Sequence, residues 1–140
     1  MIRIYTVMVA DLFHPGHVEF LRKAKELGDY LVVGLVTDEK ASRYKRLPIL
    51  TFDERREVIQ SCRYVDEVMP HLEHVSDAFL DKHNFAFRVY AARDEAENTR
   101  HLNRFKNHLS PSRFKRVDYD PRISTTKIIK RVISGKIFYS

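Results

Sequence analysis

The side chains best suited by type and spacing to do chemistry lie in residues 11–17, which read Asp-Leu-Phe-His-Pro-Gly-His. They follow an apolar run and precede a helical pattern. His14 and His17 are three residues apart across this predicted helix start, so both imidazoles can face one point. The first N–H groups of a helix attract anions, Pro15 suits the start of a helix, and Gly16 allows close approach to the backbone. We predict a cradle for a phosphoryl group whose charge grows during a reaction.

A second candidate anion site lies near the carboxyl end of the chain, where residues 123–126 read Ile-Ser-Thr-Thr. These residues open the last predicted helix, so hydroxyl groups and unpaired N–H groups occur together. Taken alone, the stretch also fits an ordinary N-cap. If Ser124, Thr125 and Thr126 face the two histidines, the two helix starts would bind one anionic ligand between them.

Strand and helix patterns alternate along the chain, as a parallel sheet requires. The expected strands are 2–9, 30–36, 64–69, 85–91 and 114–119. The expected helices are 16–27, 51–62, 75–83, 95–108 and 125–134, with a short helix and a basic loop over 38–50. We therefore predict an α/β fold: a Rossmann-like, doubly wound, five-stranded parallel sheet with helices on both faces, in one domain over residues 1–140. Ligands then belong at the carboxyl ends of the strands, beside the topological switch point.

Three local features sharpen these expectations. Thr51 with Glu54 three residues later forms a capping box. Pro70 is expected to stop the third strand. The last helix is expected to bury one apolar side, made of Ile128, Ile129, Val132 and Ile133.

Composition limits the class of protein. Hydrophobic residues make up 44% of the 140 residues, which argues against disorder. The single cysteine, Cys62, excludes an internal disulfide framework. No apolar run approaches the roughly 20 residues of a membrane span, and Met1 leads directly into a strand, so we expect a cytoplasmic protein.

The net charge of +6 favours polyanionic partners. Nucleic acid is one interpretation, but the sequence has no zinc ligands, no helix-turn-helix signal and no interleaved aromatic platform. A small ligand that carries several negative charges is the simpler explanation.

The motifs resemble a known family. His-x-Gly-His after a first strand is similar to the signature of a nucleotidyltransferase superfamily with a Rossmann-like sheet. Further matches are Leu-Val-Val-Gly at 31–34, Thr-Asp-Glu at 37–39, Arg-Tyr-Val-Asp-Glu-Val at 63–68 and Ile-Ser-Thr-Thr at 123–126. Together these motifs resemble the cytidylyltransferases that activate glycerol 3-phosphate, phosphocholine or phosphoethanolamine.

The resemblance implies roles for individual residues. His14, His17, Arg46 and Thr125 would be catalytic, while Arg55, Lys45 and Arg46 would bind the acceptor. The nucleotide would contact Val9, Ala10, Asp11, Gly16, Arg63, Asp66, Ile123, Ser124, Thr125 and Thr126. Arg55 also stands out because a cation in the first turn of a helix opposes the helix dipole, which suggests a ligand-facing task. Asp38 is interpreted as structural.

The sequence also departs from the family pattern. Met8 replaces the glycine of the usual Gly-x-Phe-Asp, residues 91–95 read Ala-Ala-Arg-Asp-Glu instead of carrying paired aspartates, and residues 119–122 replace Arg-Thr-Glu-Gly. The nucleobase is therefore open. The leading hypothesis is transfer of CMP from CTP to a phosphorylated small alcohol, such as glycerol 3-phosphate or a phosphocholine-like acceptor. An adenylyltransferase using ATP and a flavin or sugar phosphate, and a nucleotide-binding module without turnover, are the alternatives.

Magnesium is the expected counter-ion of the triphosphate, held by phosphate oxygens and water with one carboxylate at most. Asp11 is the nearest candidate carboxylate, unless it only braces a histidine. No His or Cys cluster has transition-metal spacing, and no protein-bound metal site is predicted. A homodimer is a further expectation from the family.

Overall fold

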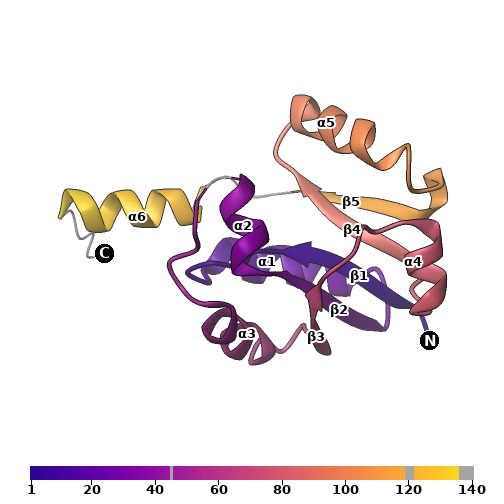
Figure 1. Ribbon diagram of the computed structural model, residues 1–140, viewed down its shortest axis with the longest axis horizontal. Coiled ribbons are helices and arrows are strands. Elements are labelled where there is room, and N and C mark those ends of the chain that lie inside the picture. The colour runs from indigo at the N-terminus through magenta and orange to yellow at the C-terminus, as the bar shows by residue number, and fades with distance from the viewer. Residues whose placement is uncertain (45, 119–121, 136–140) are drawn as a thin grey trace.

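The computed structural model describes residues 1–44, 46–118 and 122–135. Its five strands form one parallel sheet in the order β3-β2-β1-β4-β5 (Figure 1). The strands are β1 (Arg3–Met8), β2 (Tyr30–Val36), β3 (Glu67–His71), β4 (Phe87–Ala92) and β5 (Phe114–Asp118). The helices are α1 (Pro15–Lys25), α2 (Asp38–Tyr44), α3 (Phe52–Gln60), α4 (Asp77–Lys82), α5 (Glu95–Phe105) and α6 (Thr125–Ser134), with a 3-10 turn at Pro111–Arg113.

Two apolar clusters cover the two faces of the sheet. One joins β1 and β2 to Phe20 and Leu21 of α1 and to Ile59 of α3. The other lies beneath α4 and α5 and includes Leu80 of α4 and Phe105 of α5. The predicted α/β, doubly wound fold with helices on both faces is confirmed.

Local sequence explains several of these elements. The run 30–36 forms β2 with the predicted bounds, and six of its seven residues are buried, as expected for a strand covered on both faces. Thr51 caps α3 through the predicted capping box, in which its hydroxyl accepts from the Glu54 N–H and the Glu54 carboxylate accepts from the Thr51 N–H.

The third strand differs from its prediction. It begins at Glu67 rather than at residue 64, and it continues through Pro70 to His71. β3 is an edge strand, paired only with β2 in the described sheet. A proline without a donor is tolerated on an edge strand, so Pro70 does not end it.

The last helix has the predicted bounds but not the predicted burial. None of the α6 residues is buried, and Val132 and Ile133 are 76% and 80% exposed. Figure 1 shows why: α6 extends away from the sheet, so only its start lies against the domain. The prediction that Val132 and Ile133 lie on a buried side is wrong.

The switch point of the sheet lies between β1 and β4. β1 pairs with β2 over six residue pairs, but with β4 over only two, of which the second joins Tyr5 and Arg88. Beyond that pair the two strands separate toward their carboxyl ends, with the Thr6 hydroxyl still donating to the Val89 carbonyl at 2.9 Å. This separation opens the crevice in which ligands of such sheets bind.

Among the residues that the structure describes, none of the helices has both the length and the apolar character needed to cross a bilayer.

Candidate active site

A cavity of about 1070 Å³ lies where β1 and β4 separate. Its walls are built from both strands, the start of α1, the start of α6, the segment around Arg46 and one side of α5. Among the described residues that line it are four side chains with fixed positive charge, Lys40, Arg46, Arg88 and Arg104, against two carboxylates, Asp11 and Glu97. The cavity therefore suits an anionic ligand.

His14 occupies the N-cap of α1, and the residue is only 5% exposed. Its Nδ1 accepts a hydrogen bond from the Gly16 N–H at 3.0 Å. A ring nitrogen that accepts carries no hydrogen, so the neutral ring has its proton on Nε2. Burial lowers the pKa of His14, which keeps the ring neutral.

His17 is held in the same way. Its Nδ1 accepts from the His14 N–H at 3.1 Å, which completes a reciprocal capping box made of two histidines. Burial and the neighbouring His14 lower the pKa of His17 to about 3. The ring stacks on Phe13 and lies 3.8 Å from the His14 ring between centroids. The two rings are thus neutral and fixed, and each keeps its proton on Nε2.

The turn before α1 is shaped by Asp11. Its neighbours Ala10 and Leu12 have φ values of 55° and 49°, in the left-handed region. Asp11 is buried, and its two carboxylate oxygens accept from the N–H groups of Ile49 and Leu50 at 2.8 and 3.0 Å. Asp11 therefore fastens the end of the basic loop, and no hydrogen bond links its carboxylate to either histidine among the described residues.

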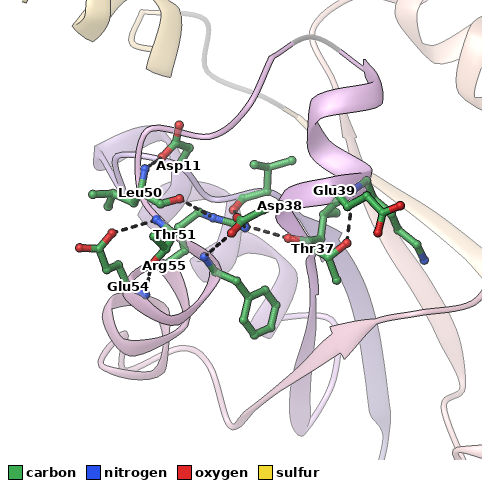
Figure 2. A network of polar contacts seen from close by, with 12 residues as sticks. Asp11, Thr37, Asp38, Glu39, Leu50, Thr51, Glu54 and Arg55 are labelled. Atoms are coloured by element: carbon green, nitrogen blue, oxygen red, sulfur yellow. Dashed lines mark hydrogen bonds and ion pairs between the residues drawn. The ribbon is translucent and has the colours of Figure 1, made fainter.

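Arg55 also holds the end of the basic loop, through a hydrogen bond to the same Leu50 whose N–H Asp11 accepts (Figure 2). Its guanidinium donates to the carbonyls of Val9 at 2.7 Å, Val36 at 2.9 Å and Leu50 at 3.1 Å, and to the Asp38 carboxylate at 2.6 Å. The side chain is fully buried and does not line the cavity. The prediction that Arg55 faces the acceptor is wrong. Its guanidinium opposes the dipole at the start of α3, but the three backbone carbonyls and the Asp38 carboxylate compensate its positive charge. Asp38 is structural, as predicted, and also accepts from the Phe52 N–H.

The start of α6 faces the start of α1. The Thr125 hydroxyl donates to the Asp11 carbonyl at 2.8 Å, and a Cβ added to Gly16 would lie 3.4 Å from a methyl carbon of Ile123. Ser124 caps α6 by accepting from the Lys127 N–H at 3.1 Å. Ser124, Thr125 and Thr126 line the same cavity as His14 and His17. The two predicted helix starts therefore converge.

The other cavity-lining residues expected at the nucleotide are Val9, Ala10, Asp11 and Gly16, and Met8 lines the cavity beside them. Gly16 is needed for the site geometry, since an added Cβ would lie 2.8 Å from Cε1 of His14. Ile123 does not line this cavity but borders a smaller hollow beside the α1 start.

Arg46 lines the cavity, and its Nε is buried without a hydrogen-bond partner among the described residues. A buried donor without a partner is costly, so this Nε is available to a ligand. Lys45, its predicted neighbour in acceptor binding, lies outside the described residues.

Arg63 and Asp66 lie elsewhere. Both are exposed and neither lines the cavity. The Asp66 N–H donates to the carbonyl of Leu31, which pairs with Ile4 near the amino end of β1. His14 follows the opposite end of β1, so within one chain the prediction that these two residues contact the same nucleotide is wrong.

The sequence interpretation missed the basic residues on the other side of the cavity. Arg88 lies in β4, Arg104 and His101 lie on α5, and His71 ends β3. A sequence signal existed for Arg88, since it interrupts an otherwise apolar strand pattern at a position that faces the second core cluster. The histidines and Arg104 carry no comparable local signal.

The donor set does not resemble a resident metal centre. Within residues 1–44, 46–118 and 122–135 there is no group of three or more His, Cys, Asp or Glu side chains that could hold a metal ion. Both Asp11 oxygens already accept backbone N–H groups. A divalent cation at this site would therefore take most of its ligands from a bound triphosphate and from water.

Comparison with known proteins agrees with this geometry. The sequence model of the family described as cytidylyltransferase-like matches residues 7–131. The chain therefore belongs to the cytidylyltransferase-like family.

Among individual relatives, it is 31% identical to the ethanolamine-phosphate cytidylyltransferase of Mus musculus over 95% of this chain and 33% of that protein. It is 33% identical to choline-phosphate cytidylyltransferase 2 of Arabidopsis thaliana over 94% of this chain and 45% of that protein. The chain thus spans less than half the length of these curated relatives.

A similar fold is found in the crystal structure of a lipopolysaccharide core biosynthesis protein from Thermoplasma volcanium, with a TM-score of 0.62 and 26% identity over 86% of this chain and 97% of that one.

Proposed function

We propose that this chain is a nucleotidyltransferase that transfers CMP from CTP to a phosphorylated small alcohol and releases pyrophosphate. The single observation that carries the proposal is the convergence of two helix starts on one cavity, with two neutral histidines at the first and three hydroxyl residues at the second. The relatives named for CTP-dependent transfer to ethanolamine phosphate and choline phosphate support the same reaction class.

The reaction joins two anions. A phosphate oxygen of the acceptor forms a bond to the α-phosphorus of CTP while the bond from that phosphorus to the bridging oxygen of the β-phosphate breaks, and pyrophosphate leaves with the electron pair. An ionised phosphate needs no base to attack. The protein must therefore position the two reactants and oppose their repulsion.

His14 and His17 suit this task as donors rather than as proton carriers. Their Nδ1 atoms already accept backbone N–H groups, so each Nε2–H is left to donate to the phosphate that gains charge in the transition state. Because the rings are fixed by the α1 start, little reorganisation accompanies the reaction.

The start of α6 would hold the β- and γ-phosphates. The N–H groups of Thr125 and Thr126 belong to the first helical turn, where no intrahelical acceptor exists, and anions bind there. Arg46, whose Nε has no hydrogen-bond partner within the described part of the chain, would contact the transferred phosphate from the basic loop, which Asp11 and Arg55 hold in place.

Magnesium would accompany the triphosphate and neutralise part of its charge. A homodimer and a cytoplasmic location are further predictions, and light scattering of the purified chain tests the first.

Release of pyrophosphate tests the proposal. The assay compares CTP with ATP against phosphorylated alcohols whose other end is positive, neutral or negative, using the wild-type chain, His14→Ala and His17→Ala. We expect turnover with CTP that both substitutions abolish while circular dichroism shows a folded chain. Turnover with ATP alone would support the adenylyltransferase alternative. Nucleotide binding without pyrophosphate release under any acceptor would support the binding module.

A further inference from the structure

The cavity has a second end, which we name the basic compartment and define by Lys40, His71, Arg88, His101 and Arg104. Arg88 pairs with Tyr5 at the last residue pair that joins β1 and β4, so it lies at the floor of the crevice. Val9 lies four residues after Tyr5 and directly precedes the turn that leads to His14. At about 3.3 Å per residue, the backbone at Tyr5 and Arg88 therefore lies ~13 Å from the backbone at Val9.

The guanidinium groups of Arg88 and Arg104 both lie near the Phe105 ring, within 4.6 and 5.9 Å of its centroid, and no carboxylate pairs with either among the described residues. Among the described residues neither Arg88 nor Arg104 forms an ion pair, and the Nε of Arg88 is buried without a hydrogen-bond partner. The Arg88 guanidinium lies 4.6 Å from the centroid of the Phe105 ring. Burial and the like charge of Arg104 lower the pKa of Arg88 to about 10, which still leaves it positively charged at neutral pH. A protein that holds two cations together in this way provides a place for an anion.

The other groups around Arg88 do not neutralise it. His71 shares a hydrogen bond of 2.8 Å with the Tyr5 hydroxyl, and burial with the charges of Arg88 and Lys40 lowers its pKa to about 4. The ring is therefore neutral. Lys40 donates to the His71 carbonyl at 2.9 Å and keeps its charge nearby.

The nearby carboxylates are already paired. Glu97 accepts from Arg93 at 2.7 Å and lies 3.6 Å from His101, while Glu73 pairs with Lys82 at 3.1 Å. Of the two carboxylates among the described cavity residues, Glu97 is the one near the basic compartment. Its shortest ion pair is with Arg93, which does not line the cavity. The compartment thus keeps an excess of positive charge.

We propose that the basic compartment binds an acidic group, such as a carboxylate, at the end of the acceptor opposite its phosphate. This inference rests on the proposed function and narrows its substrate class. A phosphorylated amino alcohol would bring an ammonium group against two guanidinium groups, which repel it. A small phosphorylated hydroxy acid would place its phosphate toward His14 and His17 and its carboxylate against Arg88 and Arg104, where planar bidentate contacts are available.

The matched substrates are 3-phosphoglycerate and glycerol 3-phosphate, which differ by a carboxylate in place of a hydroxymethyl group, with phosphocholine as the cationic acceptor. Pyrophosphate release with CTP is measured for each acceptor on the wild-type chain, Arg88→Met, Arg104→Met and the control Arg100→Met. Arg100 is exposed on the same helix as Arg104 and does not line the cavity. If Arg88→Met does not fold, Arg104→Met still tests the proposal, because Arg104 is exposed and its replacement should leave the core intact.

We expect 3-phosphoglycerate to exceed glycerol 3-phosphate in kcat/KM by at least about tenfold, the factor that a charge-assisted hydrogen bond supplies. Arg88→Met and Arg104→Met should remove this preference by raising the KM for the acceptor, with the KM for CTP and the Arg100→Met variant unchanged. Preference for phosphocholine overturns the inference. An equal rise in the KM for CTP also overturns it, since the compartment would then serve the triphosphate.

Direct binding separates this inference from the proposed function. Calorimetry of 3-phosphoglycerate and phosphocholine with the wild-type chain and the same variants needs no turnover. If no acceptor releases pyrophosphate, the proposed function fails, yet Arg88-dependent binding of 3-phosphoglycerate would still support an acid-binding compartment. If pyrophosphate is released but binding and turnover are independent of both arginines, the inference fails alone.

Discussion

Replacing His14 by asparagine and by glutamine separates two tasks that the imidazole performs. The Oδ1 of asparagine occupies nearly the position of Nδ1, so it can accept from the Gly16 N–H that lies 3.0 Å from Nδ1. It has no group at the position of Nε2. Glutamine has the opposite properties, since its amide N–H reaches the Nε2 position but its side chain caps a helix poorly.

The structure sets the expected magnitudes. Asparagine is among the best N-cap residues, so His14→Asn should change the free energy of unfolding by less than about 1 kcal/mol. Loss of one fixed donor to a developing oxyanion should lower kcat by about 100- to 1000-fold. His14→Gln should lose about 1 kcal/mol of stability through the cap. It should keep its rate within about tenfold of the wild type, because the donor is retained.

Urea unfolding followed by circular dichroism measures the stability, and single-turnover pyrophosphate release with CTP measures the rate. Equal rates for His14→Asn and the wild type would refute the assignment of Nε2–H as the donor. A His14→Asn chain that loses several kcal/mol would show instead that the imidazole is needed for folding.

Three further predictions concern the surroundings of this pair. Gly16→Ala should lower kcat on the order of 100-fold, because the new Cβ would lie 2.8 Å from Cε1 of His14 and displace the ring; an unchanged rate would contradict the geometry. Arg55→Met should lower the free energy of unfolding by about 3 kcal/mol, since it leaves Asp38 and three carbonyls without their donor; normal stability in urea with a raised acceptor KM would restore the acceptor-binding role. Because burial lowers the pKa of His17 to about 3 from 6.5, the unfolded chain takes up a proton below pH 6.5 that the folded chain does not. The free energy of unfolding should therefore fall as pH drops below 6.5, by up to about 1.4 kcal/mol per pH unit from this group, and His17→Gln should show a shallower slope.

The fold could be predicted because its signals are local. The run 30–36 is continuously apolar, and Thr51 with Glu54 marks a helix start whatever surrounds it. The prediction that Pro70 ends β3 is wrong because a proline is tolerated where β3 lies at the edge of the sheet, and the order of the strands decides this, not the local sequence. In the same way, the apolar periodicity of α6 indicates a face but not whether anything covers it.

The parts of the candidate site that lie at a helix start can be predicted from the sequence. The parts that form only when distant segments of the chain come together cannot. That His14, His17 and Thr125 would line one cavity could be predicted because helix starts have a known chemistry. Arg55 looks identical in sequence whether it faces a ligand or the carbonyls of Val9 and Val36, since those carbonyls meet only when β1 and β2 are paired. Arg88 lines the cavity because β1 and β4 separate beyond it, and the sequence of β4 alone does not indicate this separation.

The central claim is that the starts of α1 and α6 bind one triphosphate together, and nitrogen-15 NMR during a CTP titration tests it most directly. We predict that the Nε2 resonances of His14 and His17 and the amide resonances of Thr125 and Thr126 shift together, with one dissociation constant. Shifts confined to one helix start, or two unequal dissociation constants, would contradict the claim.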